Sequence, residues 1–307
     1  MKSYAIALCL IGIGASSARA QNELTSQCQT VGSSAAMVQQ CRLGAAAIAE
    51  TQEAVGLAFT GGNPLPGASS TLGIRLGAIP RLSAALRLSV ARINTDGFRD
   101  YASDDGFTSY PRAVNVDVAV GVFSGLSVFP TVGGFGSIDL LGSFGKATLS
   151  GDDGFVDSPT SWSAGARVGI LRESFTAPGI AVSAMYRSFG DIQQGEPGSN
   201  DQDVFFNSLN NSVLSLRGTV GKRLLMFGAT AGVGYDKYSG DVNMSVRTAP
   251  GATTFGTVQA DDYGESRTSF FGNLSWTMLI LHIVGEFGVQ RGEGNTHFGS
   301  LAIRLAL

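Results

Sequence analysis

Ionisable side chains recur inside segments of this sequence that are apolar at every second position. The positions between the apolar ones form a polar face, which carries six arginines, three carboxylates and one histidine. Three carboxylates cannot neutralise six arginines, so either the excess positive charge is hydrated or this polar face attracts anions. Both interpretations stay open from the sequence. The residues that the alternation places together on this polar face are Arg75, Arg87, Asp117, Asp139, Arg167, Arg187, Arg217, His282, Glu286 and Arg304.

Catalytic patterns are not found among these residues. The chain has two histidines, His282 and His297, and no Ser stands in a local motif with His282. We interpret His282 as a member of an interior hydrogen-bond network. The sequence contains no P-loop, HExxH or GxSxG pattern, and the stretch at 94–97, which is similar to part of a calcium loop, lacks the bidentate Glu. We therefore expect no enzyme activity, no cofactor and no metal site.

The first twenty residues are predicted to form a cleavable signal peptide, 1–20. Lys2 supplies a positive start, residues 4–14 form an apolar stretch, and Ala18 and Ala20 provide small residues before the cleavage point. The apolar stretch is too short to span a bilayer as a helix. These features indicate an exported protein.

Composition narrows the class further. Loss of Lys2 and Arg19 with the signal peptide changes the net charge from −3 to −5, which argues against nucleic acid as a partner. Charged residues make up 15% of the chain, against roughly 25% in soluble proteins. Together with 42 glycines, this favours a membrane β-barrel.

Residues 21–50 do not alternate and are predicted to form a separate N-terminal segment, with a short Ala-rich helical stretch that includes 35–38 and 43–50. Cys28 and Cys41 lie in this segment, and an exported protein meets an oxidising compartment. We therefore expect a Cys28–Cys41 disulfide. Three placements stay open for the segment: a plug that enters the lumen from the periplasm, a cap on one end of the barrel, or a loose periplasmic extension.

Residues 51–307 alternate with a period of two, as antiparallel strands with one apolar face do. The other face is rich in Gly, Ser, Ala and Arg and poor in Lys, which favours a membrane barrel over a soluble β-sandwich or lipocalin-like barrel. We expect an all-β, antiparallel, up-and-down transmembrane barrel of about twelve strands. The stripes lie at 55–59, 72–78, 82–90, 114–122, 138–144, 162–170, 180–186, 214–220, 225–235, 270–278, 281–289 and 301–307.

The connections between these stripes alternate in length. Short connections in the periplasm and long, extracellular ones are the expected asymmetry of outer-membrane barrels. The short ones lie near 79–81, 124–134, 172–178, 222–224 and 278–280, and the long ones near 94–112, 148–160, 189–211 and 236–266.

Across residues 51–307 the chain resembles the superfamily of bacterial outer-membrane β-barrels, porins and transporters among them. The last stripe, 301–307, resembles the C-terminal strand signal read by the barrel assembly machinery, although it ends in Leu307 rather than Phe. Asn63 and Pro64 are similar to a feature of the fatty-acid transporter group. The resemblance implies the bacterial outer membrane as location, and its lipid, lipopolysaccharide and the assembly machinery as partners.

Two function classes follow from this fold. The first, which we predict, is a passive pore or facilitator for small solutes, narrow or plugged because about twelve strands enclose little space. The second is a non-transporting structural barrel, or one that binds a ligand or partner through long extracellular loops. A lumen blocked by side chains or by the N-terminal segment would favour the second class.

Overall fold

The computed structural model describes residues 24–30, 34–73, 81–101, 106–127, 133–196, 202–292 and 295–307. The predicted signal peptide, 1–20, and Arg75 lie outside these residues. No helix in the described ranges combines the length and the apolarity needed to cross a membrane.

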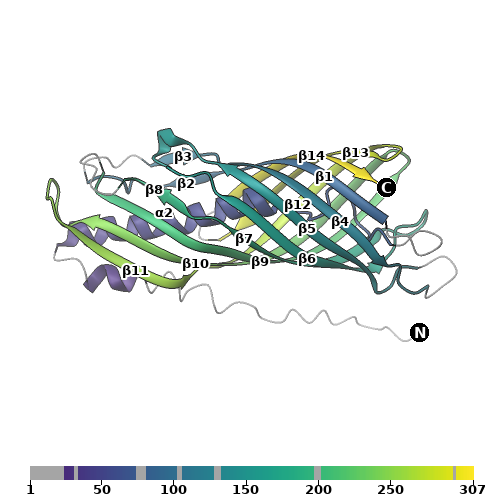
Figure 1. Cartoon of the computed structure of the whole chain (residues 1–307), viewed down its shortest axis with the longest axis horizontal. Coiled ribbons are helices and arrows are strands. Elements are labelled where there is room, and N and C mark those ends of the chain that lie inside the picture. The colour runs from purple at the N-terminus through teal and green to yellow at the C-terminus, as the bar shows by residue number, and fades with distance from the viewer. Residues whose placement is uncertain are drawn as a thin grey trace, which may run out of the picture.

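Ten antiparallel strands close into a barrel (Figure 1). Closure comes from β1, which pairs with β4 along one edge and with β14 along the other. The barrel strands are β1 (Arg81–Ala91), β4 (Arg112–Phe123), β5 (Ser137–Thr148), β6 (Thr160–Leu171), β7 (Gly179–Phe189), β9 (Val204–Leu224), β10 (Phe227–Arg247), β12 (Ser266–Met278), β13 (Leu281–Arg291) and β14 (Asn295–Ala306).

The count is lower than the expected twelve because neither of the first two predicted strands is found in the described wall. Val55, Leu57 and Phe59 belong to a helix and not to a strand, since their intervening positions are Ala and Gly and all of them are buried. Of the stripe at 72–78, residues 72 and 73 lie outside any strand, and 74–78 lie outside the described residues. Each later stripe, from 82–90 onward, forms one barrel strand.

The two faces of the wall have opposite polarity. On β1, Leu86 is 51% exposed on the outside, whereas Arg87 is 1% exposed on the inside. The same alternation continues around the barrel, with Phe144 and Asp139 on opposite faces of β5. An apolar outer belt around a polar interior is the arrangement that suits a barrel surrounded by lipid.

The two ends of the barrel differ as the sequence predicts. At one end the connections are short, as between β9 and β10 or β12 and β13, and we call it the short-turn end. The other, at the left of Figure 1, is the long-loop end. There β9 and β10, with 21 residues each, are about twice as long as the 9–11 residues that span a membrane. Their outer portions carry β8 (Ile192–Gln194) and β11 (Phe255–Tyr263).

Further short elements lie between the barrel strands. A two-stranded sheet of β2 (Ile93–Thr95) and β3 (Phe107–Ser109) forms in the β1–β4 connection, and a 3₁₀ turn, η1 (Gly151–Asp153), lies in the β5–β6 connection. These elements enlarge the long-loop end.

Helix α2 (Ala35–Thr60) runs inside the barrel from the long-loop end toward its middle (Figure 1). Ser34 caps its start by accepting a hydrogen bond from the Met37 backbone N–H. The helical residues 24–30 are joined to α2 by the Cys28–Cys41 disulfide, which confirms that pairing. The N-terminal segment therefore extends into the lumen from the long-loop end, and helix continues ten residues beyond the expected boundary at residue 50.

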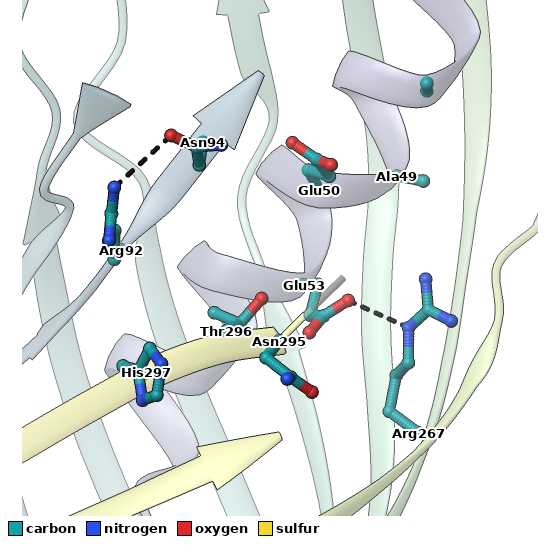
Figure 2. A pocket seen from close by; sticks show the side chains of 10 residues that line it. Ala49, Glu50, Glu53, Arg92, Asn94, Arg267, Asn295, Thr296 and His297 are labelled. Carbon is teal, nitrogen blue, oxygen red and sulfur yellow. Dashed lines mark hydrogen bonds and ion pairs between the residues drawn. The ribbon is translucent and has the colours of Figure 1, made fainter. Parts of the chain in front are cut away.

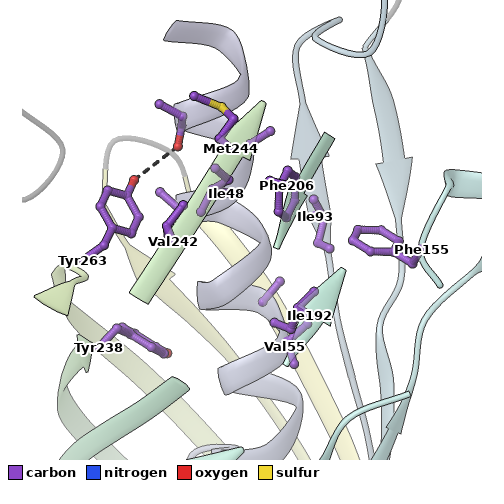
Figure 3. Packing of buried hydrophobic residues seen from close by; sticks show 14 of the residues in the cluster. Ile48, Val55, Ile93, Phe155, Ile192, Phe206, Tyr238, Val242, Met244 and Tyr263 are labelled. Atoms are coloured by element: carbon purple, nitrogen blue, oxygen red, sulfur yellow. Dashed lines mark hydrogen bonds between the residues drawn. The ribbon is translucent and has the colours of Figure 1, made fainter. Parts of the chain in front are cut away.

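The outer portion of α2 packs in a hydrophobic core rather than in a water-filled vestibule. Figure 3 shows Ile48 and Val55 of the helix among side chains from the extended strands and loops. The Tyr263 hydroxyl also donates a hydrogen bond to the Ala45 carbonyl, 3.2 Å away. Apolar contacts from both sides fix the helix in place. The partners from the wall and loops include Ile93, Phe155, Ile192, Phe206, Tyr238, Val242 and Met244.

Candidate functional site

We call residues 35–73 the lumen segment, because after α2 the chain continues inside the barrel toward the short-turn end. At Gly61 it turns with φ +57° and ψ −160°, a conformation that essentially only glycine adopts. A Cβ on Gly61 would lie 2.6 Å from Arg87 Nη1, and one on Gly62 would lie 2.4 Å from the Phe271 ring. The two glycines thus allow the backbone to contact the wall directly.

Arg87 binds the end of the helix. Its guanidinium pairs with Asp117, with Nε 3.1 Å from Oδ2, and donates hydrogen bonds to the carbonyls of Thr60 (3.2 Å) and Phe59 (3.4 Å). The last carbonyls of a helix lack intrahelical donors and carry partial negative charge, so a cation is favourable there. Arg87 therefore acts as a C-terminal cap supplied by the wall.

Arg217 makes similar contacts at the next two peptides of the chain. It pairs with Asp236 at 2.8 Å and donates to the Gly62 carbonyl (3.0 Å) and the Gly61 carbonyl (3.2 Å). Glu286 meets the N–H groups of the same turn. Its two oxygens accept hydrogen bonds from the backbone N–H groups of Gly62 (2.8 Å) and Asn63 (2.9 Å). Wall charges of both signs therefore bind the turn at residues 61–63.

Between this turn and the short-turn end, two more charged wall residues bind the backbone of the lumen segment. Asp139 accepts the N–H of Leu72 at 2.9 and 3.0 Å, and Arg167 donates to the Ala68 carbonyl at 2.7 Å. Charged hydrogen bonds to backbone are stronger than neutral ones. The lumen segment is thus bound to the wall from the middle of the barrel to its short-turn end.

The remaining predicted residues also lie on the inner face of the described wall. Arg187 donates to Ser161 Oγ at 3.0 Å and stands over the Phe59 ring. His282 shares a hydrogen bond with Thr277 at 2.9 Å. Arg304 is buried nearer the short-turn end. The structure does not gather the predicted residues into one site, since they line the interior at different depths.

Several interior charges were missed from the sequence. Asp236, the partner of Arg217, follows the outward Tyr235, and Arg267 precedes the outward Thr268, so strict alternation extended along β10 and β12 would have found both. Glu53, which pairs with Arg267 at 2.8 Å, lies on the helix. No strand period could have identified it.

A cavity of about 210 Å³ lies at the long-loop end (Figure 2). The Glu53–Arg267 pair borders it, and Arg92 donates to Asn94 at 3.4 Å on another side. In the described residues no group of three His, Cys, Asp or Glu side chains could hold a metal ion. Because Glu53, Arg92 and Arg267 all line this cavity, it contains both acidic and basic side chains. Its lining consists of Ala46, Ala49, Glu50, Glu53, Arg92, Asn94, Arg267, Asn295, Thr296 and His297.

No family model and no curated protein matches the sequence, whereas solved structures do. The translocator domain of the autotransporter NalP from Neisseria meningitidis is 11% identical, with a TM-score of 0.39 over 74% of this chain and 88% of that one. The outer membrane protease OmpT from Escherichia coli is 11% identical, with a TM-score of 0.38 over 78% and 100%. The Pseudomonas putida toluene transporter TodX is 6% identical, with a TM-score of 0.34 over 81% and 96%. These three proteins are named for different activities. What this chain shares with them is the fold, a closed antiparallel β-barrel with an apolar outer face and a polar inner face.

Proposed function

We propose that this protein is a non-conducting barrel that acts at its long-loop end by binding a ligand or partner there. The observation that carries the proposal is the lumen segment, whose backbone is hydrogen-bonded to Arg87, Arg217 and Glu286 across the middle of the barrel. This is the blocked lumen that favours the second of the two function classes inferred from the sequence.

The energetics of opening support the same conclusion. A path through the lumen would require the turn at residues 61–63 to leave these three side chains. Arg87 and Arg217 would keep their carboxylate partners on the wall, so each lost hydrogen bond between a charged side chain and the backbone costs roughly 1–3 kcal/mol, less where water replaces the partner. Several such losses at once make spontaneous opening rare. Binding at the outer end requires none of them.

The long-loop end has features suited to a binding surface. Its strands extend beyond the span that a membrane requires, and its hydrophobic core keeps α2 and the loops rigid. The cavity in Figure 2 presents Glu53, Arg267 and His297 together. A small polar ligand, or a side chain of a partner, that offers both donors and acceptors matches this lining. Lipopolysaccharide around the barrel and the barrel assembly machinery as folding partner remain predictions.

An engineered disulfide that fixes the lumen segment to the wall, called the lock below, tests the proposal. The hydroxyl oxygens of Thr71 and Ser137 are 2.5 Å apart, so a Thr71→Cys/Ser137→Cys variant can join the segment to β5 by a disulfide. We expect neither wild type nor the oxidised variant to conduct ionic current in planar bilayers. The single variant Thr71→Cys, which cannot form the disulfide, is the control. Folding is verified by heat-modifiable gel mobility. Current through wild type that the lock abolishes would overturn the proposal.

A second candidate, a passive facilitator for anions, is favoured by one observation. The short-turn end of the lumen holds a cavity lined by Arg81, Arg172, Arg223 and other basic residues. A field of that sign concentrates anions. The same experiment distinguishes the two functions, because a facilitator must conduct before the lock is closed.

A further inference from the structure

Basic side chains surround a cavity of about 340 Å³ at the short-turn end of the lumen, next to residues 67–72. Glu173 is the acidic side chain among the described lining residues, and its Oε1 accepts the backbone N–H of Arg223. Leu307, the last residue of the sequence, also borders the cavity. The basic groups are Arg81, Arg172, Lys222, Arg223 and Arg304, with His282 beside them.

Arg304 is the most unusual of these groups. It is 4% exposed, and its Nε and Nη1 have no hydrogen-bond partner among the described residues. None of the ion pairs within the described ranges includes it. Arg87 and Arg217, at comparable burial, each have a carboxylate partner. An unpaired buried guanidinium is costly, because it has lost water without gaining an acceptor.

The neighbours of Arg304 do not supply that acceptor. His282 is its register partner on β13, and His282 Nδ1 is engaged with Thr277 Oγ1 at 2.9 Å, which leaves Nε2 for another contact. Arg223 and Arg167 are close enough to act on Arg304 electrostatically, with the same charge sign. By contrast, Lys222 is already bonded to backbone carbonyls, among them that of Phe175 at 2.7 Å.

We infer that this cavity binds a small oxyanion of the phosphate type through Arg304, with His282 and Arg223 as further contacts. A guanidinium presents N–H donors in a fork that matches two oxygens of such an anion, and the surrounding positive charge stabilises it. The site lies at the opposite end of the lumen from the surface in the proposed function. It would be occupied from the short-turn side with the lumen segment in place.

Calorimetric titration tests this site with inorganic phosphate as the probe. The folded protein in zwitterionic detergent is titrated at constant ionic strength, with chloride as the reference anion. We expect Arg304→Gln to weaken phosphate binding at least about ten-fold, since a charged hydrogen-bonding group is lost. Arg304→Lys should bind with intermediate affinity, because it keeps the charge without the fork. Arg42→Gln removes an exposed cation on α2 at the other end and should leave binding unchanged.

Stability in phosphate-free buffer gives a second readout. Because the guanidinium has no partner there among the described residues, Arg304→Gln should unfold at a higher temperature than wild type, and phosphate should raise the unfolding midpoint of wild type only. If Arg304 has only a structural role, wild type should unfold at a higher temperature than Arg304→Gln. Equal phosphate affinity in wild type and Arg304→Gln, or no binding above chloride, would overturn the inference.

Addition of phosphatidylglycerol micelles identifies the source of the oxyanion. If the lipid competes with phosphate, the site binds a lipid headgroup; if it does not compete, the site binds a free anion. Conductance is not measured, so this outcome is independent of the proposed function.

Discussion

Charged residues inside this barrel bind main chain more than they bind one another. Arg87 and Arg217 each hold one carboxylate and also two carbonyls of the lumen segment. Glu286 binds two peptide N–H groups there. The arginine excess counted from the sequence is therefore met partly by peptide dipoles, which no count of carboxylates includes, and partly by the missed Asp236.

Glu286→Gln tests this role at the residue scale. The neutral amide has one acceptor oxygen where the carboxylate has two, so one N–H of Gly62 or Asn63 loses its partner. We expect the free energy of unfolding to fall by about 1–3 kcal/mol, measured by urea titration with heat-modifiable mobility. Asp152→Asn, on an exposed loop, should change it by less than about 0.5 kcal/mol. Equal effects would show that the carboxylate does not hold the turn.

Gly61→Ala tests the same turn through its backbone. A Cβ there combines a strained φ of +57° with a contact 2.6 Å from Arg87 Nη1. Strain of this kind costs of the order of 1–3 kcal/mol, and the displaced guanidinium adds to it. The same urea titration should show a lower midpoint than for Gly285→Ala, where a Cβ meets open space at an ordinary φ. A midpoint equal to that control would exclude a tight turn at residue 61.

At the scale of elements, strand and helix respond to different surroundings. Each wall strand has one face on the outside of the barrel and one toward the lumen, so its sequence alternates. Helix α2 is Ala-rich, and from Thr51 to Thr60 it is buried on all sides. Small residues let it fit inside: a Cβ on Gly56 would lie 2.4 Å from the Tyr238 ring. Small residues on every side hide the helical period that would have identified it.

Leu86→Arg tests the lipid face. Leu86 stands half-exposed in the middle of β1, opposite Val116 and Ile303, and a cation near the bilayer midplane costs about 2–4 kcal/mol. Folding into phosphatidylcholine vesicles should be destabilised by this amount. Thr257→Arg, exposed on β11 beyond the membrane-spanning region, should be nearly neutral. If both variants behave alike, the outer belt of β1 does not meet lipid.

At the scale of the whole molecule, the direction of the lumen segment is the unexpected feature. The helix begins among the long loops, where Gln40 donates to the Phe98 carbonyl at 2.5 Å, and the segment ends at Asp139 near the short turns. If the long loops are extracellular, as the asymmetry predicts, the start of α2 lies at the cell surface. A periplasmic extension does not fit this path.

Cysteine labelling on intact cells tests that orientation. Ala36→Cys places a thiol at the exposed start of α2, and Thr176→Cys places one in the exposed β6–β7 connection. A large membrane-impermeant maleimide should label Ala36→Cys on intact cells and Thr176→Cys only after permeabilisation, since Cys28 and Cys41 are paired with each other. Labelling in the opposite order would invert the barrel.

The wall of the barrel follows from local sequence alone. A period of two over each strand results from one apolar face on the outside of the barrel and one polar face toward the lumen. This pattern predicted the ten wall strands, their faces, the alternation of short and long connections, and the inward direction of the described charged residues. The disulfide was also predictable, because two cysteines lie beyond the predicted signal peptide, thirteen residues apart.

What fills the barrel depends on contacts that no local pattern encodes. Residues 55–59 resemble a strand because Val, Leu and Phe alternate with Ala and Gly, yet the closed wall buries them from every side as helix. The peptide groups that Arg217 and Glu286 bind lie over 150 residues away in the chain, and peptide groups carry no sequence signal. Long-range packing thus decided that the arginines of the polar face bind the lumen segment, where the sequence had left an anion path open. It also left Arg304 as a buried cation without a partner among the described residues.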